Sequence, residues 1–272
     1  MFFFIIGIIL IGINLSSFFL PSRSPEVYEL NQGTKMGASL SYQEVSDIIQ
    51  NTSVPRKQYL ININHAVNQG MATYWGNGNI AMMDKYLLRV PVYENYILFI
   101  MSYIMPDNFL PYEYTQYNKA LKRGIGMCDQ QTIALDGILK SQNIESKMID
   151  TPHHFFETAL ADPATNEWWI LDPDYGVVVP YDIQQITDNP ELVRPFYLNE
   201  GYSNKTIDHL VDNVYQNHNI KIHPDISEYS TKLYPFERLS YVFIWLIPLV
   251  CILPFTIGIL HKAVRRYRRK KP

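Results

Sequence analysis

The sequence predicts an α+β domain with an antiparallel sheet, flanked by two apolar helices. Three observations predict it: an uncharged apolar segment lies near each end, a helical pattern begins at Cys128, and three short strand-like runs follow that pattern. A helix followed by consecutive strands is typical of the α+β class. About 215 residues separate the two apolar segments, enough for one domain with a well-buried core.

The composition indicates a folded, acidic domain. Charged residues make up 18% and aromatic residues 14% of the 272 residues, a balance typical of folded chains. The net charge is −3, but seven of the 23 basic residues and no acid lie in 261–272, which leaves 16 basic against 26 acidic side chains elsewhere. The domain therefore has no basic surface for nucleic acid, and we expect no nucleic-acid partner. The seven basic residues are Lys262, Arg265, Arg266, Arg268, Arg269, Lys270 and Lys271.

The first apolar segment, Phe2–Leu20, is uncharged over 19 residues. A helix of this length comes close to the ~30 Å of a hydrocarbon core, because each residue adds about 1.5 Å. The segment is either an anchor or a cleavable signal peptide. No Lys or Arg precedes it and no clear small-x-small site follows it, which favours the anchor.

The second apolar segment, Tyr241–Leu260, is uncharged over 20 residues and contains Pro248 and Pro254. Membrane helices tolerate such prolines, and the basic tail places the carboxyl end in the cytoplasm by the positive-inside rule. We therefore expect a two-pass cell-membrane protein in contact with lipid. Its parts are an N-terminal anchor or signal peptide (1–21), an extracytoplasmic domain (22–238), a transmembrane helix (239–261) and a cytoplasmic tail (262–272). The sequence leaves the oligomeric state open.

Local patterns within the domain predict several elements. Tyr42–Ile49 predicts a short helix, and Tyr93–Met105, apolar at helical spacing, predicts a core helix. Cys128–Lys140 predicts a helix that begins at the cysteine, with Asp129 in its first turn as the helix dipole prefers. Three runs predict strands: Ile144–Asp150, His153–Leu160 and Trp168–Leu171.

Cys128 is the candidate centre of chemistry. The only other cysteine, Cys251, lies in the second apolar segment, so no disulfide is expected. A cysteine at a helix start feels the partial positive charge of unpaired N–H groups, which favours the thiolate. A histidine on one strand and Asp172 at the end of the next could supply a base and its orienting acceptor, because antiparallel neighbours bring facing side chains within about 5 Å.

These residues resemble the transglutaminase-like family of the papain-type cysteine enzyme superfamily, over about 85 residues from Tyr93 to Val177. The resemblance rests on RGIGMC ending at Cys128, HHFFET at 153–158 and WWILDPDYG at 168–176. The family forms look like G-x-C, H-x-W-x-E and W-x-x-x-D-P. Laid on this sequence, they imply Cys128 as nucleophile, His153 as base and Asp172 as its partner.

The spacing to Glu157 selects His153, with Phe155 in the aromatic place, and His154 is the alternative base. A regular strand would point His154 to the other face. We expect Trp168 and Trp169 to pack at the strand start, and Gln131 to be a solvated helix residue. No cofactor or metal is expected, since no second cysteine or spaced histidine pair joins His153, His154 and Cys128.

The resemblance implies a papain/transglutaminase-like core and acyl transfer, deamidation or peptide hydrolysis of a protein or peptide substrate through a thioester. The backbone N–H of Cys128 would be one oxyanion donor, and the second is not assigned. The alternative is a catalytically inactive binding module in an envelope or polysaccharide-assembly complex. A metal-dependent enzyme is a third, weaker interpretation.

Overall fold

A computed structural model describes residues 1–32, 35–74, 76–216 and 219–270. The chain divides into two compact units. The apolar unit comprises Met1–Ser22, Arg89–Tyr112 and Pro235–Pro272, and the sheet unit comprises Arg23–Leu88 and Glu113–Tyr234. The sheet unit corresponds to the predicted domain 22–238, except that 89–112 and 235–238 belong with the apolar unit.

The sheet unit is built on a five-stranded sheet whose neighbouring strands all run antiparallel, in the order β8-β7-β6-β5-β9. This confirms the predicted α+β class. The predicted strands correspond to the three central ones, and β8 and β9 were not predicted. The strands are β5 (Ser146–Asp150), β6 (Phe155–Asp162), β7 (Glu167–Asp172), β8 (Val177–Val179) and β9 (Lys221–His223).

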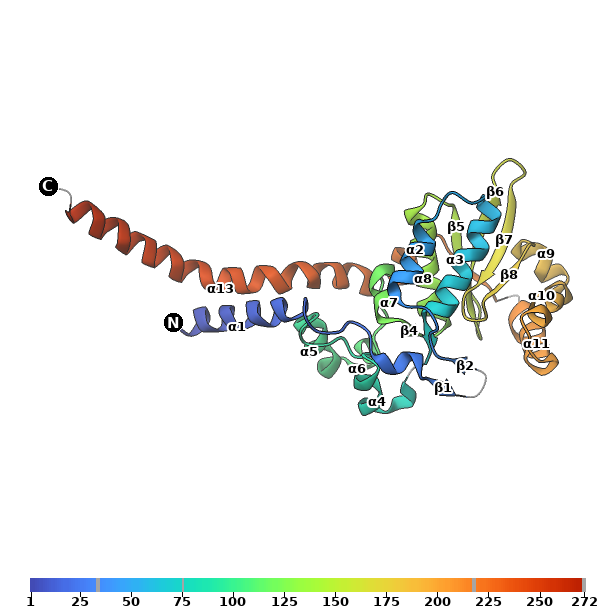
Figure 1. Cartoon of the computed structure of the whole chain (residues 1–272), viewed down its shortest axis with the longest axis horizontal. Coiled ribbons are helices and arrows are strands. Elements are labelled where there is room, and N and C mark those ends of the chain that lie inside the picture. The colour runs from blue at the N-terminus through green and yellow to red at the C-terminus, as the bar shows by residue number, and fades with distance from the viewer. Residues whose placement is uncertain (33–34, 75, 217–218, 271–272) are drawn as a thin grey trace. The chain divides into compact units, whose positions relative to one another are not determined.

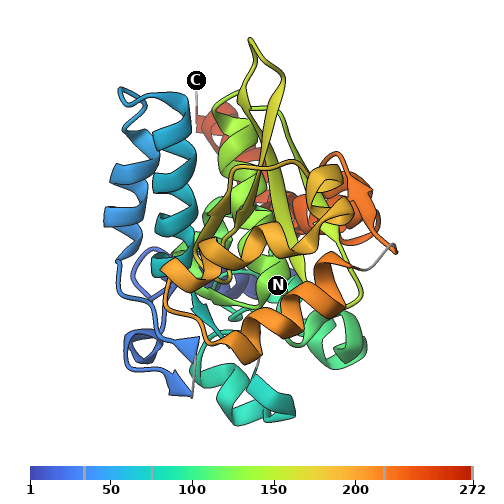
Figure 2. The same cartoon turned by 90° about the vertical axis from the view of Figure 1, so that its right-hand side faces the viewer.

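Helices cover both faces of this sheet, because each strand presents alternate apolar side chains to each side (Figure 2). Phe156 and Ile170 join the larger core cluster, which includes residues of α9, α10, α11 and the π-helical turn Val211–Tyr215. Phe155 and Met148 pack with Ile133 of α8 on the other face. The helices concerned are α3 (Arg56–Gly70), α8 (Cys128–Ser141), α9 (Ile183–Asp188), α10 (Arg194–Asn199) and α11 (Asn204–Leu210).

Shorter elements complete the sheet unit. Helix α2 starts at the predicted residue, Tyr42, because Ser41 and Glu44 form a reciprocal capping box. The others are α4 (Ile80–Lys85), α7 (Tyr117–Arg123), α12 (Ile226–Tyr229), three 3₁₀ turns (Pro25–Tyr28, Gly76–Gly78, Pro190–Val193), the antiparallel pair β1 (Asn31–Gln32) and β2 (Lys35–Met36), and the parallel pair β3 (Ala72–Thr73) and β4 (Ile125–Gly126).

The apolar unit contains α1 (Phe2–Ser16), α5 (Tyr96–Ile104), α6 (Pro106–Phe109) and most of α13 (Leu233–Lys270). Among the described residues, one helix is long and apolar enough to cross a membrane, the Leu233–Lys262 part of α13. Two such helices were expected. Helix α1 has 15 residues, a rise of about 22 Å that falls short of a ~30 Å core.

Helix α1 ends before Leu20 because two serines compete for its last carbonyls. The hydroxyls of Ser16 and Ser17 donate to the carbonyls of Ile13 and Asn14, at 2.7 and 2.6 Å. The predicted basic tail continues α13 as far as Lys270, and Lys271 lies outside the described residues.

Helices α1 and α13 pack together within the apolar unit, where α1 runs beside α13 (Figure 1). Pro248 has no N–H, so the carbonyl of Ile244 one turn earlier loses its usual helical donor. The Asn14 side-chain amide donates to this carbonyl at 2.5 Å, and the Tyr96 hydroxyl does so at 3.3 Å. Such replacement donors explain how α13 continues through a proline.

Candidate active site

Cys128 is the first residue of α8, as predicted, and its side chain is partly exposed. The preceding β4 strand pairs with β3, and its Gly126 lies so close to the Gln130 side chain that a Cβ would come within 2.5 Å. Gly124 adopts a left-handed conformation (φ 69°) that ends α7. The two glycines of RGIGMC therefore allow the tight passage from α7 through β4 to the cysteine.

His154 is held at the start of β6 by a turn built on Thr151. The backbone N–H of Thr151 donates to the His154 carbonyl at 3.0 Å, and its hydroxyl donates to the same oxygen at 2.7 Å. The His154 N–H in turn donates to that hydroxyl at 3.0 Å. Thr132 of α8 donates to the carbonyl of Phe155 at 3.0 Å, which fixes the helix against the same strand end.

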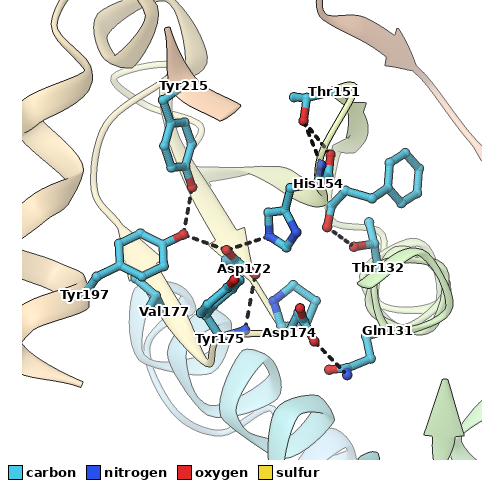
Figure 3. Close-up of polar contacts among 12 residues, drawn as sticks. Gln131, Thr132, Thr151, His154, Asp172, Asp174, Tyr175, Val177, Tyr197 and Tyr215 are labelled. Atoms are coloured by element: carbon cyan, nitrogen blue, oxygen red, sulfur yellow. Dashed lines mark hydrogen bonds and ion pairs between the residues drawn. The ribbon is translucent and has the colours of Figure 1, made fainter. Parts of the chain in front are cut away.

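The structure brings His154, and not His153, together with Asp172. The His154 Nε2 lies 2.9 Å from Oδ2 of Asp172, and both side chains are buried (Figure 3). His153 is exposed, and its ring lies near that of His209. The choice of His153 from the motif spacing thus does not match this geometry. The pairing of Glu157 with Leu171 puts even-numbered β6 residues on the face of Asp172, so His154 faces the carboxylate.

Cys128 is the third member of the candidate triad, with His154 and Asp172. Since Nε2 of His154 contacts Asp172, Nδ1 of His154 is the ring nitrogen left for the Cys128 thiol. Burial disfavours the His154 cation, but the charge and hydrogen bond of Asp172, with a smaller contribution from Cys128, raise its pKa well above the usual range. The arrangement therefore favours an imidazolium between a carboxylate and a sulfur.

Two tyrosines extend this chain of hydrogen bonds. The Tyr197 hydroxyl of α10 donates to Oδ2 of Asp172 at 2.5 Å and lies 2.8 Å from the hydroxyl of Tyr215 (Figure 3). The backbone N–H of Tyr175 donates to Oδ1 at 3.3 Å. The side chains of Tyr197 and Tyr215 are buried, so donors from the protein itself orient Asp172. Sequence reasoning missed Tyr197 and Tyr215 because they lie 20 and 38 residues beyond Val177, where the motif region ends.

Helix α3 holds the turn that follows Asp172. The Asn64 amide donates to the carbonyls of Asp172 and Val177, at 3.3 and 3.1 Å. One turn later, Asn68 donates to the carbonyls of Pro173 and Asp174, at 2.9 and 3.0 Å. The sequence feature that could have indicated this role is the spacing of the two asparagines, because residues four apart share a helix face.

Gln131 is buried, so the prediction of a solvated residue was wrong. Its amide nitrogen donates to Thr73 Oγ1 at 2.8 Å and approaches Oδ1 of Asp174 at 3.4 Å, while Thr73 donates to the same carboxylate oxygen. Gln130 is equally engaged with the backbone of Tyr114. Both amide nitrogens therefore already have acceptors within the protein. The N–H of Cys128 stands in the first turn of α8, where helical geometry supplies no acceptor.

A carboxyl pair borders the cysteine. Glu113 and Asp129 share a hydrogen bond, and burial, followed by this neighbour, raises the pKa of Glu113 well above its usual range. The protonated form of Glu113 is therefore favoured beside the cysteine. Phe155 stacks on Tyr229 at 4.7 Å beside Cys128, and this aromatic pair forms an apolar wall next to the thiol.

Comparisons with family models, with curated proteins and with solved structures find no match to this chain. Among the described residues, no group of three or more His, Cys, Asp or Glu side chains could hold a metal ion. The candidate active site is therefore interpreted from its own geometry.

Proposed function

We propose that this chain is a membrane-anchored thiol enzyme of the transglutaminase-like kind, which acts on amide bonds through Cys128, His154 and Asp172. The observation that carries the proposal is the buried contact of His154 with Asp172 at 2.9 Å beside the partly exposed Cys128. A nucleophile, a base and an orienting acceptor in this order are the parts that covalent thiol catalysis requires.

In the first step, the Cys128 thiolate attacks the carbonyl carbon of an amide. A C–S bond forms, and the Cys128 N–H donates to the developing oxyanion. The imidazolium of His154 gives its proton to the amide nitrogen, the C–N bond breaks and an amine leaves. Asp172, fixed by Tyr197 and Tyr175, stabilises the imidazolium before this transfer.

In the second step, water or an amine attacks the thioester carbonyl. The neutral His154 accepts a proton from the attacking group, the C–S bond breaks and the thiolate returns. Water gives hydrolysis or deamidation, and an amine gives acyl transfer. The acceptor that reaches Cys128 first decides among these reactions.

The membrane part of the proposal rests on α13. Its Leu233–Lys262 segment is long and apolar enough to cross a bilayer, and Arg265 and Arg266 follow it. This order supports a cytoplasmic carboxyl end and an extracytoplasmic sheet unit. Helix α1 supports retention as a second membrane segment, since Asn14 binds the α13 carbonyl that Pro248 leaves free.

The proposal is tested by acylation of the full-length protein in detergent with p-nitrophenyl acetate. We expect a burst of p-nitrophenol and an acetyl group on Cys128, followed by slower turnover that an added primary amine accelerates. Cys251→Ala is the matched control and should keep the burst, whereas Cys128→Ser should lose it. A reaction no faster than that of a free thiol would refute the enzyme.

That negative result would favour the second candidate, an inactive binding module of the same fold. One observation fits this candidate: the Phe155 and Tyr229 stack lies next to Cys128 and gives the site an apolar surface. In Cys128→Ser, a binding module should still bind its partner. In the same variant, an enzyme should form no thioester.

A further inference from the structure

Helix α5 exposes an apolar surface, although its sequence predicted a core helix. Ile100, Tyr103, Ile104 and Met105 expose 51%, 62%, 66% and 46% of their surface. Residues 95–106 contain no charged side chain. Single exposed apolar residues are common, but four within six positions form a patch of the kind that marks a binding surface.

The amino end of α5 is fixed to α13. Asn95 caps α5 and donates to Ser240 Oγ at 2.8 Å. The Tyr96 hydroxyl donates to the Ile244 carbonyl at 3.3 Å, and the Tyr241 hydroxyl donates to Glu94 at 2.9 Å. The helix therefore starts beside the first turn of the apolar run of α13.

Exposed apolar residues of α13 lie at the same level as these contacts. Leu239, Val242 and Phe243 expose 53%, 59% and 42% of their surface, next to the buried Ser240 and Ile244 that face α5. The amino end of α5 thus lies at the level where the apolar surface of α13 that would enter lipid begins. This common level favours lipid over a separate protein partner.

The length and ends of α5 fit a position on the bilayer surface. Its nine residues rise about 13.5 Å, less than half of a ~30 Å hydrocarbon core. The exposed polar residues Asp107 and Asn108 follow directly. The Arg89 guanidinium donates to the Tyr103 hydroxyl at 2.5 Å and lies 4.6 Å from its ring centroid. Tyrosine is a residue of the headgroup region, and the buried Arg89 holds the exposed Tyr103 in place.

We propose that α5 lies in the extracytoplasmic headgroup region of the bilayer that α13 crosses, with Ile100, Ile104 and Met105 at the acyl boundary. The inference rests on the proposed membrane anchoring. The extracytoplasmic leaflet follows from the contacts at Ser240 and Ile244, which lie at the end of the span away from the basic tail.

The test uses the full chain in lipid nanodiscs, in a Cys128→Ser, Cys251→Ala background. A bimane fluorophore is attached to one new cysteine at a time: Ile104→Cys on α5, Val250→Cys at the middle of the α13 span as the membrane control, and Gln50→Cys at the exposed end of α2 as the water control. Emission is measured with spin-labelled lipids, which carry the label near the headgroup or deep in the acyl chain, and with aqueous iodide.

We expect the label at position 104 to lose more emission to the shallow spin label than to the deep one, and position 250 to show the reverse. Iodide should quench position 50. The inference is overturned if position 104 responds only to iodide, or is shielded from every quencher by a second protein copy, while position 250 responds to lipid. If position 250 also fails to respond, the anchoring is wrong and the inference falls with it. The background lacks Cys128, so catalysis does not affect the result.

Discussion

Replacing His154 by glutamine should remove the base without emptying the site. An alanine would leave Asp172 buried without its partner, at a cost of about 3–5 kcal/mol, and the domain could unfold. The glutamine amide can still donate to Asp172, but it cannot take up a proton from Cys128. His153→Gln is the matched control, since His153 is exposed and lies outside the group.

The expected effect is a change in how the alkylation rate of Cys128 depends on pH. With the imidazolium in place, iodoacetamide should react at a nearly constant rate between about pH 5 and 7, because the thiol proton resides on His154. In His154→Gln the alkylation rate should fall about tenfold for each unit by which the pH is lowered, as for a free cysteine. The fall from pH 7 to pH 5 should be about 100-fold. His153→Gln should keep the flat profile.

Alkylation is measured by mass spectrometry of the peptide that contains Cys128, so Cys251 does not contribute. Thermal denaturation in the same detergent checks that both variants remain folded. A flat profile in His154→Gln together with a steep one in His153→Gln would refute the assignment of the base.

Three further predictions concern stability. Burial raises the pKa of Asp136 to about 6 from 3.8, so the folded state should lose about 3 kcal/mol from this residue as the pH rises from about 4 to above 6. In urea titrations, the pH-dependent loss of Asp136→Asn should be smaller than that of the parent protein by this amount. Tyr197→Phe should cost about 1.5–3 kcal/mol because a buried carboxylate loses a donor, whereas Tyr202→Phe, which loses a bond to a carbonyl, should cost about 1 kcal/mol in the same titration. Asn14→Leu should destabilise the apolar unit by about 0.6–1.7 kcal/mol in thermal melts in detergent. The cost should be smaller in a Pro248→Ala background, because the carbonyl of Ile244 then regains a helical donor. An equal cost in both backgrounds would contradict this account.

Much of the sheet unit follows from local pattern. The helix at Cys128 was predictable from its apolar stripe, and the three central strands from short apolar runs bounded by turn residues. Most elements that escaped prediction are short: β8 and β9 have three residues each, and α10 has six, although α3, with 15 residues, escaped as well. Such short segments form because tertiary contacts hold them, and a short window of sequence carries too little signal for them.

The sequence shows which segments are apolar, but it does not show what these segments contact. Residues 93–105 are apolar at helical spacing whether they face a protein core or lipid. The spacing alone therefore could not separate a core helix from the exposed α5. The length of α1 was not predicted because Ser16 and Ser17 end the helix within an uncharged stretch, where the composition does not change.

The identity of the base depends on one extra residue in β6. Near the hairpin loop, Asp162 pairs with Glu167, and if that register continued, Asp172 would lie opposite Glu157 and on the face of His153. The register shifts between Leu160 and Asp162, so that Glu157 instead pairs with Leu171. A shift of one residue turns every later side chain to the opposite face. The bulge therefore exchanges one histidine of the pair for the other, and a spacing rule that counts along the chain from His153 to Glu157 cannot detect it.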